Sequence, residues 1–137
     1  MKEEEKEKEK ENTEVKGEGK PYDLKVRTKD FALRIIRLYA SLPKNTEAQV
    51  IGRQILRSGT SVGAQYHEAH RGKSDADFIN KIEGALQELD ETAYWLELLG
   101  EANILPVDRL KPLSQETDEL TAIFVTMVKK VKERKNF

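Results

Sequence analysis

The sequence predicts an all-α fold, an antiparallel up-down-up-down four-helix bundle, and three observations support this prediction. Apolar residues recur every three or four positions in four successive segments, which is the spacing of helices that each bury one face. The connections between these segments are short, and short connections place consecutive helices antiparallel and side by side. Charged residues make up 36% of the chain and aromatic residues 7%, which is typical of long helices rather than of a β-sandwich.

The chain divides into a predicted disordered charged tail, residues 1–22, and a bundle domain, residues 23–137. The tail has almost no apolar side chains, so folding could not bury enough surface to offset the lost conformational entropy. No apolar run approaches the roughly 18 residues of a membrane span, and the charged N-terminus is unlike a secretory signal. The chain has no cysteine, which excludes disulfides and thiolate metal sites. We expect a cytoplasmic protein without a membrane partner.

The first helix is predicted to begin at Thr28 as its N-cap, with Asp30 in its first turn. The apolar positions that follow are spaced by four, three and four residues: Phe31, Ile35, Leu38 and Leu42. Pro43 ends this helix, and the short connection brings the second helix back alongside it.

The second helix is predicted over residues 46–71, although it contains Gly52, Gly59 and Gly63. A glycine inside a helix costs about 1 kcal/mol relative to alanine. Either the helix breaks near residue 59, or the small residues allow a neighbouring backbone to approach closely. Helical spacing continues through Val62 and Ala69, which favours a continuous helix.

The third helix is predicted over residues 75–102, after a tight corner at residues 71–73. Gly72 can adopt the left-handed conformation that closes a helix, and Ser74 with Asp77 forms a capping-box-like start for the next. This helix carries a second apolar edge besides its core stripe. We interpret that edge as an oligomer interface; the alternative is that its aromatic side chains cover the rim of the same core. The edge consists of Ile79, Tyr94, Trp95 and Leu98.

The fourth helix is predicted from about residue 107 or 108 to residue 134. Its apolar positions repeat with the 3-4 spacing of coiled-coil-like bundle packing: Leu110, Leu113, Thr117, Leu120, Phe124, Met127 and Val131. Pro112 falls near the first turn, where a missing N–H group is tolerated.

Charge is distributed unevenly along a chain whose formal net charge is −1. Residues 21–73 contain ten Lys and Arg against four Asp and Glu, whereas residues 74–126 contain three against twelve. Antiparallel pairing of the second and third helices places Arg57 near Glu88 and Glu91. We interpret these three residues as a structural polar pair that fixes the register between the helices.

The basic residues are the strongest functional indication. Their predicted role is to bind nucleic acid through its phosphate backbone, with little sequence selectivity and a strong dependence on salt. Few of them lie beside exposed aromatic residues, so base stacking is not expected. The alternative is an ordinary solvated charged face. The candidates are Lys29, Arg34, Arg37, Arg53, Arg71, Lys73, Lys129, Lys130 and Arg134.

No catalytic or metal motif reaches its required spacing. His67 and His70 are three residues apart, whereas the zinc-protease helix motif needs histidines four apart. The stretch from Gly59 to Gly63 lacks both the lysine of a phosphate-binding loop and a preceding strand. We therefore predict no catalytic residue, no metal, no cofactor and no enzymatic activity.

Over residues 24–134 the chain resembles the 23S rRNA intervening-sequence protein family. The matching positions lie in the second and third helices: Gln54-Ile55-Leu56-Arg57-Ser58, Ser61-Val62, Glu68-Ala69, Ser74, Asp77-Phe78-Ile79, Ala85-Leu86, Glu88-Leu89 and residues 91–99. The resemblance implies a homo-oligomer, typically a pentameric barrel, without known enzymatic activity. A related branch is the accessory variability determinant of diversity-generating retroelements, a basic pentamer that binds nucleic acid and associates with a reverse transcriptase. This chain differs from that branch in its near-neutral charge and acidic third helix.

Two functions follow as hypotheses. The first is a non-catalytic, homo-oligomeric accessory factor that binds RNA or DNA and acts with a reverse transcriptase. The second is a protein-interaction scaffold that uses its apolar third-helix edge and binds no nucleic acid.

Overall fold

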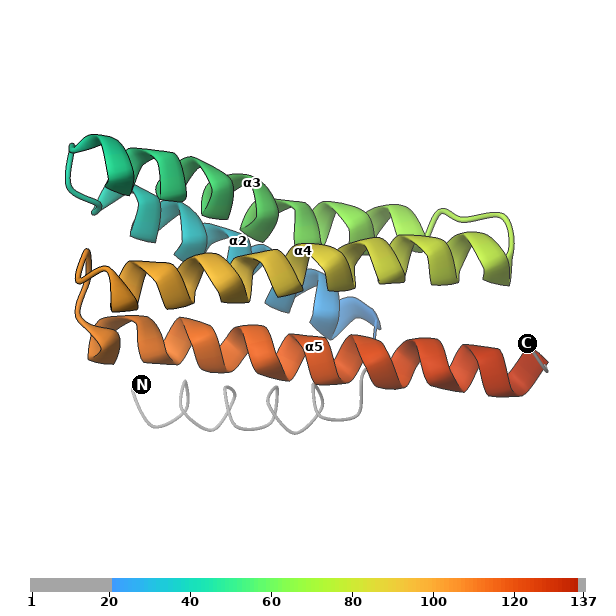
Figure 1. Cartoon of the computed structure of the whole chain (residues 1–137). Helices are drawn as coiled ribbons and strands as arrows, with labels where there is room; N and C mark the ends of the chain where they lie inside the picture. Colours follow the sequence, from blue (N-terminus) through green and yellow to red (C-terminus); the bar gives the residue numbers. More distant parts are fainter. Residues whose placement is uncertain (1–20, 136–137) are drawn as a thin grey trace, which may run out of the picture.

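The computed structural model describes residues 21–135, which form four α-helices and no strand (Figure 1). Helix α2 spans Pro21–Ala40, α3 spans Thr46–Ala69, α4 spans Asp75–Glu101 and α5 spans Val107–Lys135. The predicted all-α architecture of four helices is confirmed. The tail predicted at residues 1–22 lies outside the described residues, except for its last two positions, which belong to α2.

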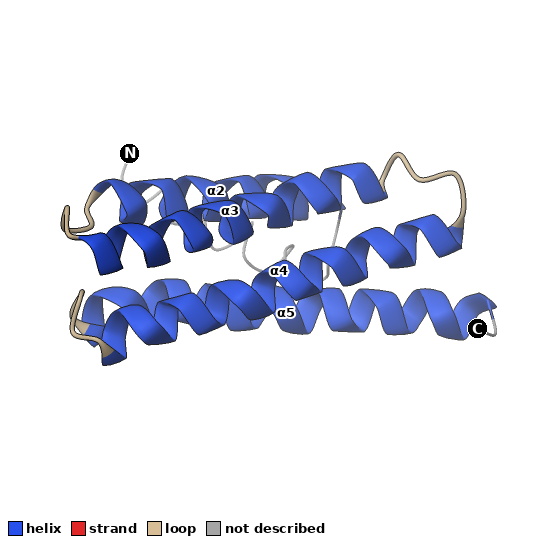
Figure 2. Cartoon of the chain, turned by 45° about the horizontal axis from the view of Figure 1, so that its top comes forward, coloured by secondary structure: helices blue, strands red, loops and turns tan. Residues whose placement is uncertain are grey.

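Consecutive helices run in opposite directions, so the chain goes up and down the bundle (Figures 1 and 2). Helix α3 packs against both α2 and α4, and α4 packs against α5, whereas α2 and α5 touch only slightly. No close backbone contact joins α2 to α4, or α3 to α5, within residues 21–135. Helices α2 and α4 therefore occupy opposite corners of the bundle.

The start of α2 corrects the prediction that Thr28 is a helix N-cap. The helix begins at Pro21, a residue whose fixed φ suits the first helical position. Thr28 lies inside the helix, is buried, and donates a hydrogen bond from Oγ1 to the Leu24 carbonyl oxygen at 2.7 Å. Its hydroxyl group thus finds its partner one turn earlier in the same helix, and the fully buried Leu24 extends the apolar stripe towards the N-terminus.

Side chains cap the N-terminal ends of α3 and α4, and the cap of α4 is the predicted Ser74. Asn45 accepts a hydrogen bond from the Ala48 amide at Oδ1, at 2.9 Å. Ser74 accepts one from the Asp77 amide at Oγ, at 3.1 Å. Helix α3 ends at Ala69 rather than at residue 71, and residues 70–74 connect it to α4.

Close packing explains the glycines of α3, which is continuous through all three of them. A Cβ atom at Gly59 would lie 2.6 Å from Ile35 Cγ1, and one at Gly52 would lie 2.6 Å from Leu42 Cδ1. Both neighbours are buried side chains of the α2 side of the core. The small residues therefore let α2 approach α3, as the second of the two alternatives predicts.

Candidate functional site

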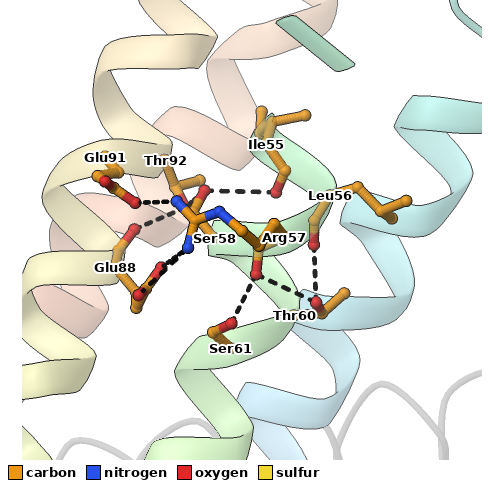
Figure 3. Close-up of polar contacts among 9 residues, drawn as sticks. All are labelled: Ile55, Leu56, Arg57, Ser58, Thr60, Ser61, Glu88, Glu91 and Thr92. Carbon is orange, nitrogen blue, oxygen red and sulfur yellow. Dashed lines mark hydrogen bonds and ion pairs between the residues drawn. The ribbon is translucent and has the colours of Figure 1, made fainter. Parts of the chain in front are cut away.

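Arg57 of α3 contacts two carboxylates of α4 (Figure 3). Its Nη1 lies 3.2 Å from Glu88 Oε2, and its Nη2 donates a hydrogen bond to Glu91 Oε2. The bond to Glu91, more than any other interaction, raises the pKa of Arg57, whereas burial raises the pKa of the Glu88 carboxyl despite the nearby guanidinium. Half of the Arg57 side chain is exposed, so these contacts orient the two helices and add little stability.

Two buried hydroxyl groups lie beside this charged group (Figure 3). Ser58 Oγ and Thr92 Oγ1 are 2.8 Å apart, and Thr92 also donates to the Glu88 carbonyl oxygen at 2.8 Å. The other neighbour of Ser58 is the Ile55 carbonyl oxygen. None of these partners is a general base, so the arrangement joins α3 to α4 and does not activate Ser58 as a nucleophile.

The two histidines lie near the C-terminal end of α3. Both are exposed, and the ring of His70 stands edge-on to Tyr66, with centroids 4.6 Å apart, and to Phe78, at 6.1 Å. Burial, and to a lesser extent the charges of Lys25 and His67, lowers the pKa of His70. Within residues 21–135, no group of three or more His, Asp or Glu side chains is placed to hold a metal ion.

Five of the nine predicted nucleic-acid-binding residues lie at one end of the bundle. The connection from α3 to α4 and the last turns of α5 meet at this end, on the right of Figure 1, and we name it the corner end. The remaining four, Lys29, Arg34, Arg37 and Arg53, are spread along α2 and the first half of α3. The structure therefore separates the candidates into two groups. The corner end carries Arg71, Lys73, Lys129, Lys130 and Arg134.

Most cations of the corner end have no carboxylate partner. Among the described residues, no ion pair involves the side chain of Arg71, Lys73, Lys129 or Lys130. Arg134 Nη2 lies 3.6 Å from Asp75 Oδ1, a long contact. Lys132, also in the last turns of α5, lies 3.5 Å from Glu83 Oε1. Arg27 and Arg57, which are paired more closely, lie elsewhere in the bundle.

The predicted oligomer interface is only partly exposed. Ile79 is 7% exposed and belongs to the hydrophobic core, so its assignment to an outer edge was wrong. The position is covered from within the same chain, which leaves almost no surface for a second subunit. Tyr94 is 54% exposed, Trp95 is partly buried against the core, and Leu98 is intermediate. The rings of Tyr94 and Trp95 meet edge-on, with centroids 5.1 Å apart.

A second exposed apolar surface lies on α2. It is formed by Val26, Leu33 and Ile36, whose spacing places them on one side of the helix. The exposed cations Lys29 and Arg37 lie four residues before and after Leu33, on the same side, together with the exposed Asp30. We name this surface the α2 face.

The surface around Tyr94 has the opposite charge. Asp90 and Glu97 lie one turn before and after Tyr94, and both are exposed. Glu101 continues the same side of the helix. We name the exposed surface formed by these acidic residues with Tyr94 and Leu98 the α4 face.

One strong ion pair was missed by the sequence interpretation. Arg27 of α2 donates two hydrogen bonds to Glu116 of α5, at 2.8 and 2.6 Å. The prediction that the first helix begins at Thr28 left Arg27 outside it. The only signal in the sequence was Leu24, which continues the apolar spacing towards the N-terminus. A helix that includes Leu24 also includes Arg27.

The fold and surfaces described above define a class of protein: an up-and-down bundle of four helices with a group of cations at one end and, among residues 21–135, no cluster of side chains placed to hold a metal ion. The family of 23S rRNA-intervening sequence proteins matches residues 22–126, and the chain belongs to this family. The resemblance noted from the sequence is thus confirmed. None of the described helices has the length and apolar character needed to cross a membrane.

A solved structure supports the same family. The crystal structure of a protein with unknown function from the S23 ribosomal protein family of Bacteroides thetaiotaomicron is 38% identical to this chain, with a TM-score of 0.75. The match covers 80% of this chain and 97% of the Bacteroides protein. No curated protein matches the chain.

Proposed function

We propose that this chain is a non-catalytic, homo-oligomeric protein that binds nucleic acid as an accessory factor. The observation that carries the proposal is the group of cations at the corner end, four of which have no carboxylate partner among the described residues. The name of the family, which refers to an intervening sequence of 23S rRNA, supports RNA as the ligand.

Unpaired cations favour phosphate for a physical reason. A lysine or arginine that is already bonded to a carboxylate must lose that bond before it can bind a phosphate group. The side chains of Arg71, Lys73, Lys129 and Lys130 carry no such bond within residues 21–135, so only water and counterions need to be displaced. Binding of this kind reads the backbone and not the bases, and it weakens steeply as salt rises.

The two exposed apolar faces support self-association. The α2 face is apolar and basic, the α4 face is apolar and acidic, and the two helices lie at opposite corners of the bundle. Contact between different faces of identical chains is heterologous, and such contacts form a ring when the rotation between copies closes and an open filament when it does not. We propose that the α2 face of one copy packs on the α4 face of the next, and the family resemblance gives a pentamer as the ring size.

A ring would also strengthen binding. Each copy presents the same corner end, so the cations are repeated around the symmetry axis. Several weak contacts to one RNA molecule then act together, and the overall affinity exceeds that of a single copy without any new kind of contact.

A titration with matched charge variants tests nucleic-acid binding. Fluorescence anisotropy of labelled structured RNA and DNA is measured against the full chain between about 50 and 200 mM salt. One triple variant reverses the corner end: Arg71→Glu, Lys73→Glu and Lys130→Glu. The control reverses three exposed cations at the opposite end of the bundle, with the same change in net charge: Lys44→Glu, Arg109→Glu and Lys111→Glu.

We expect micromolar binding by the wild-type chain and by the control. The corner-end variant should bind more weakly and lose about one unit of the salt slope for each phosphate contact removed. Equal loss in the two triple variants would mean that only the overall charge matters. Absence of binding by the wild-type chain at micromolar concentration would contradict the proposal.

The second candidate function is a protein-interaction scaffold, which the exposure of Tyr94 and Leu98 on the α4 face favours. On this hypothesis the α4 face binds a different protein instead of a second copy. A reverse transcriptase is the partner that the family resemblance implies. Co-purification from the native host, with the Tyr94→Glu variant as a control, separates a specific partner of this face from nonspecific capture.

A further inference from the structure

A pocket of about 490 Å³ lies at the corner end. The connection from α3 to α4, the first turn of α4 and the last turns of α5 line it.

The floor of the pocket is apolar and aromatic. Phe78, Met127 and Val131 form it, and the imidazole of His70 stands edge-on to the Phe78 ring. Burial lowers the pKa of His70, which favours the neutral imidazole. A planar group can therefore pack on this floor without contacting a full charge.

The rim of the pocket carries charge. Lys73 and Arg134 both line it, and the carboxylate of Asp75 lies between the start of α4 and Arg134. Lys73 lies close to a second carboxylate as well, because its backbone amide donates a hydrogen bond to Asp77 Oδ2 at 3.3 Å. A ligand that fits this combination has a flat, largely apolar part joined to an anion.

We propose that the pocket binds one unpaired nucleotide, with its base against Phe78 and His70 and its phosphate between Lys73 and Arg134. The inference rests on the proposed function and names its substrate class: nucleic acid that presents unpaired bases. Stacking of bases on aromatic side chains is how proteins bind unpaired nucleotides, and a base within a duplex cannot enter such a pocket. The volume lies in the usual range for small-ligand sites.

This inference revises the expectation that base stacking plays no part. The sequence interpretation judged the basic residues to be distant from exposed aromatic residues. In the structure, the fold of the corner brings Lys73 within the same pocket as Phe78, and the end of α5 adds Arg134.

Methionine NMR gives a direct test, because Met1 and Met127 are the two methionines of the chain. The full chain is labelled with ¹³C at the methionine methyl groups, and the Met127→Leu variant assigns the signals. Adenosine 5′-monophosphate, ribose 5-phosphate and adenosine are titrated separately. A base lying over the floor shifts the Met127 signal by its ring current.

We expect saturable movement of the Met127 signal with adenosine 5′-monophosphate and weaker binding of adenosine, which lacks the phosphate. Ribose 5-phosphate should leave the signal almost unmoved. Lys73→Ala should weaken the nucleotide at least severalfold, whereas Lys44→Ala, at the opposite end, should not. An unmoved Met127 signal at millimolar nucleotide, or an equal shift with ribose 5-phosphate, overturns the pocket assignment.

The outcome is separable from that of the proposed function. Binding of fully paired RNA depends on the cations of the corner end and not on the pocket floor. The Phe78→Leu variant, checked for folding by circular dichroism, should keep its affinity for duplex RNA and lose the preference for RNA with unpaired loops. Equal affinity of the wild-type chain for both RNAs contradicts the pocket alone, whereas no binding to either contradicts the proposed function.

Discussion

Arg27 and Glu116 join α2 and α5, the neighbouring helices of the bundle that otherwise touch least. Arg27 Nε lies 2.8 Å from Glu116 Oε2, and Nη2 lies 2.6 Å from Oε1. The two side chains are 12% and 15% exposed. The bond to Glu116, more than any other interaction, raises the pKa of Arg27 against the opposing effect of burial. This two-point contact holds α2 near α5 where the direct packing is slight.

Removing one member of this pair should destabilise the bundle. Arg27→Ala leaves the Glu116 carboxylate largely buried without its partner, and we expect a loss of about 2 kcal/mol in the free energy of unfolding. Urea denaturation followed by circular dichroism measures it. Lys81→Ala, which breaks an exposed pair with Glu68 at 2.9 Å, is the control and should have a much smaller effect. Equal losses would contradict a special role for Arg27.

Replacing each of two glycines with alanine should have different effects on the free energy of unfolding. Gly59→Ala should lower the free energy of unfolding by about 1–3 kcal/mol, because the new Cβ would lie 2.6 Å from Ile35, a fully buried side chain. Gly84→Ala should range from no change to a gain of about 1 kcal/mol, since its Cβ would meet only the flexible end of Gln65, at 3.2 Å. Thermal and urea unfolding of both variants measure the difference. A tolerated alanine at residue 59 would contradict the close approach of α2.

Tyr66 should make the protein sensitive to alkali. It is fully buried and stacked on Phe124, with ring centroids 5.6 Å apart. Burial, followed by the charge of Asp23, raises the pKa of the Tyr66 phenol in the folded state. The unfolded phenol ionises near pH 10, so its contribution to stability is present below that pH and declines as the pH rises above it.

The free energy of unfolding between pH 8 and about 11 measures this contribution, with phenolate absorbance as a second signal. Tyr66→Phe removes the phenol and keeps the ring. Its stability should fall less steeply with pH than that of the wild-type chain. The same alkaline slope in both proteins would show that Tyr66 does not ionise on unfolding.

The four helices and most of their ends could be predicted from the sequence, because apolar spacing and capping residues are local signals. Asn45 and Ser74 act as caps for this reason. Thr28 misled the prediction because a threonine hydroxyl can bond either the next turn, as a cap, or the preceding turn, as it does here.

Contacts between helices were harder to predict. Periodicity gives the face on which Ile79 lies but not that its own chain covers that face. The stagger between two helices also depends on their packing, which brings Gln65 of α3 against Gly84 of α4. The contact of Arg57 with Glu88 and Glu91 could be predicted from the sequence, because long side chains tolerate a shift in the stagger between the two helices. The contact between Arg27 and Glu116 could not be predicted, because it depends on where α2 begins and how it crosses α5.

Complementing variants should reveal how copies meet. Leu33→Glu puts a negative charge on the α2 face, which would repel the acidic α4 face of the next copy. Tyr94→Glu replaces the exposed aromatic side chain of the α4 face with a charge. Each variant alone should be a monomer. A mixture should form a heterodimer of twice the chain mass, because one intact α2 face and one intact α4 face remain. Native mass spectrometry of the mixture measures this, and two monomers with no heterodimer would contradict a contact between different faces.

The mass of the wild-type chain in solution tests the proposed assembly most directly. Multi-angle light scattering on the full chain at micromolar concentration should give a defined multiple of 15.7 kDa, with five copies as the expected number. The Leu33→Glu and Tyr94→Glu variants should return it to one copy. A wild-type chain that elutes at 15.7 kDa over the whole concentration range would contradict the ring and the multivalent binding that depends on it.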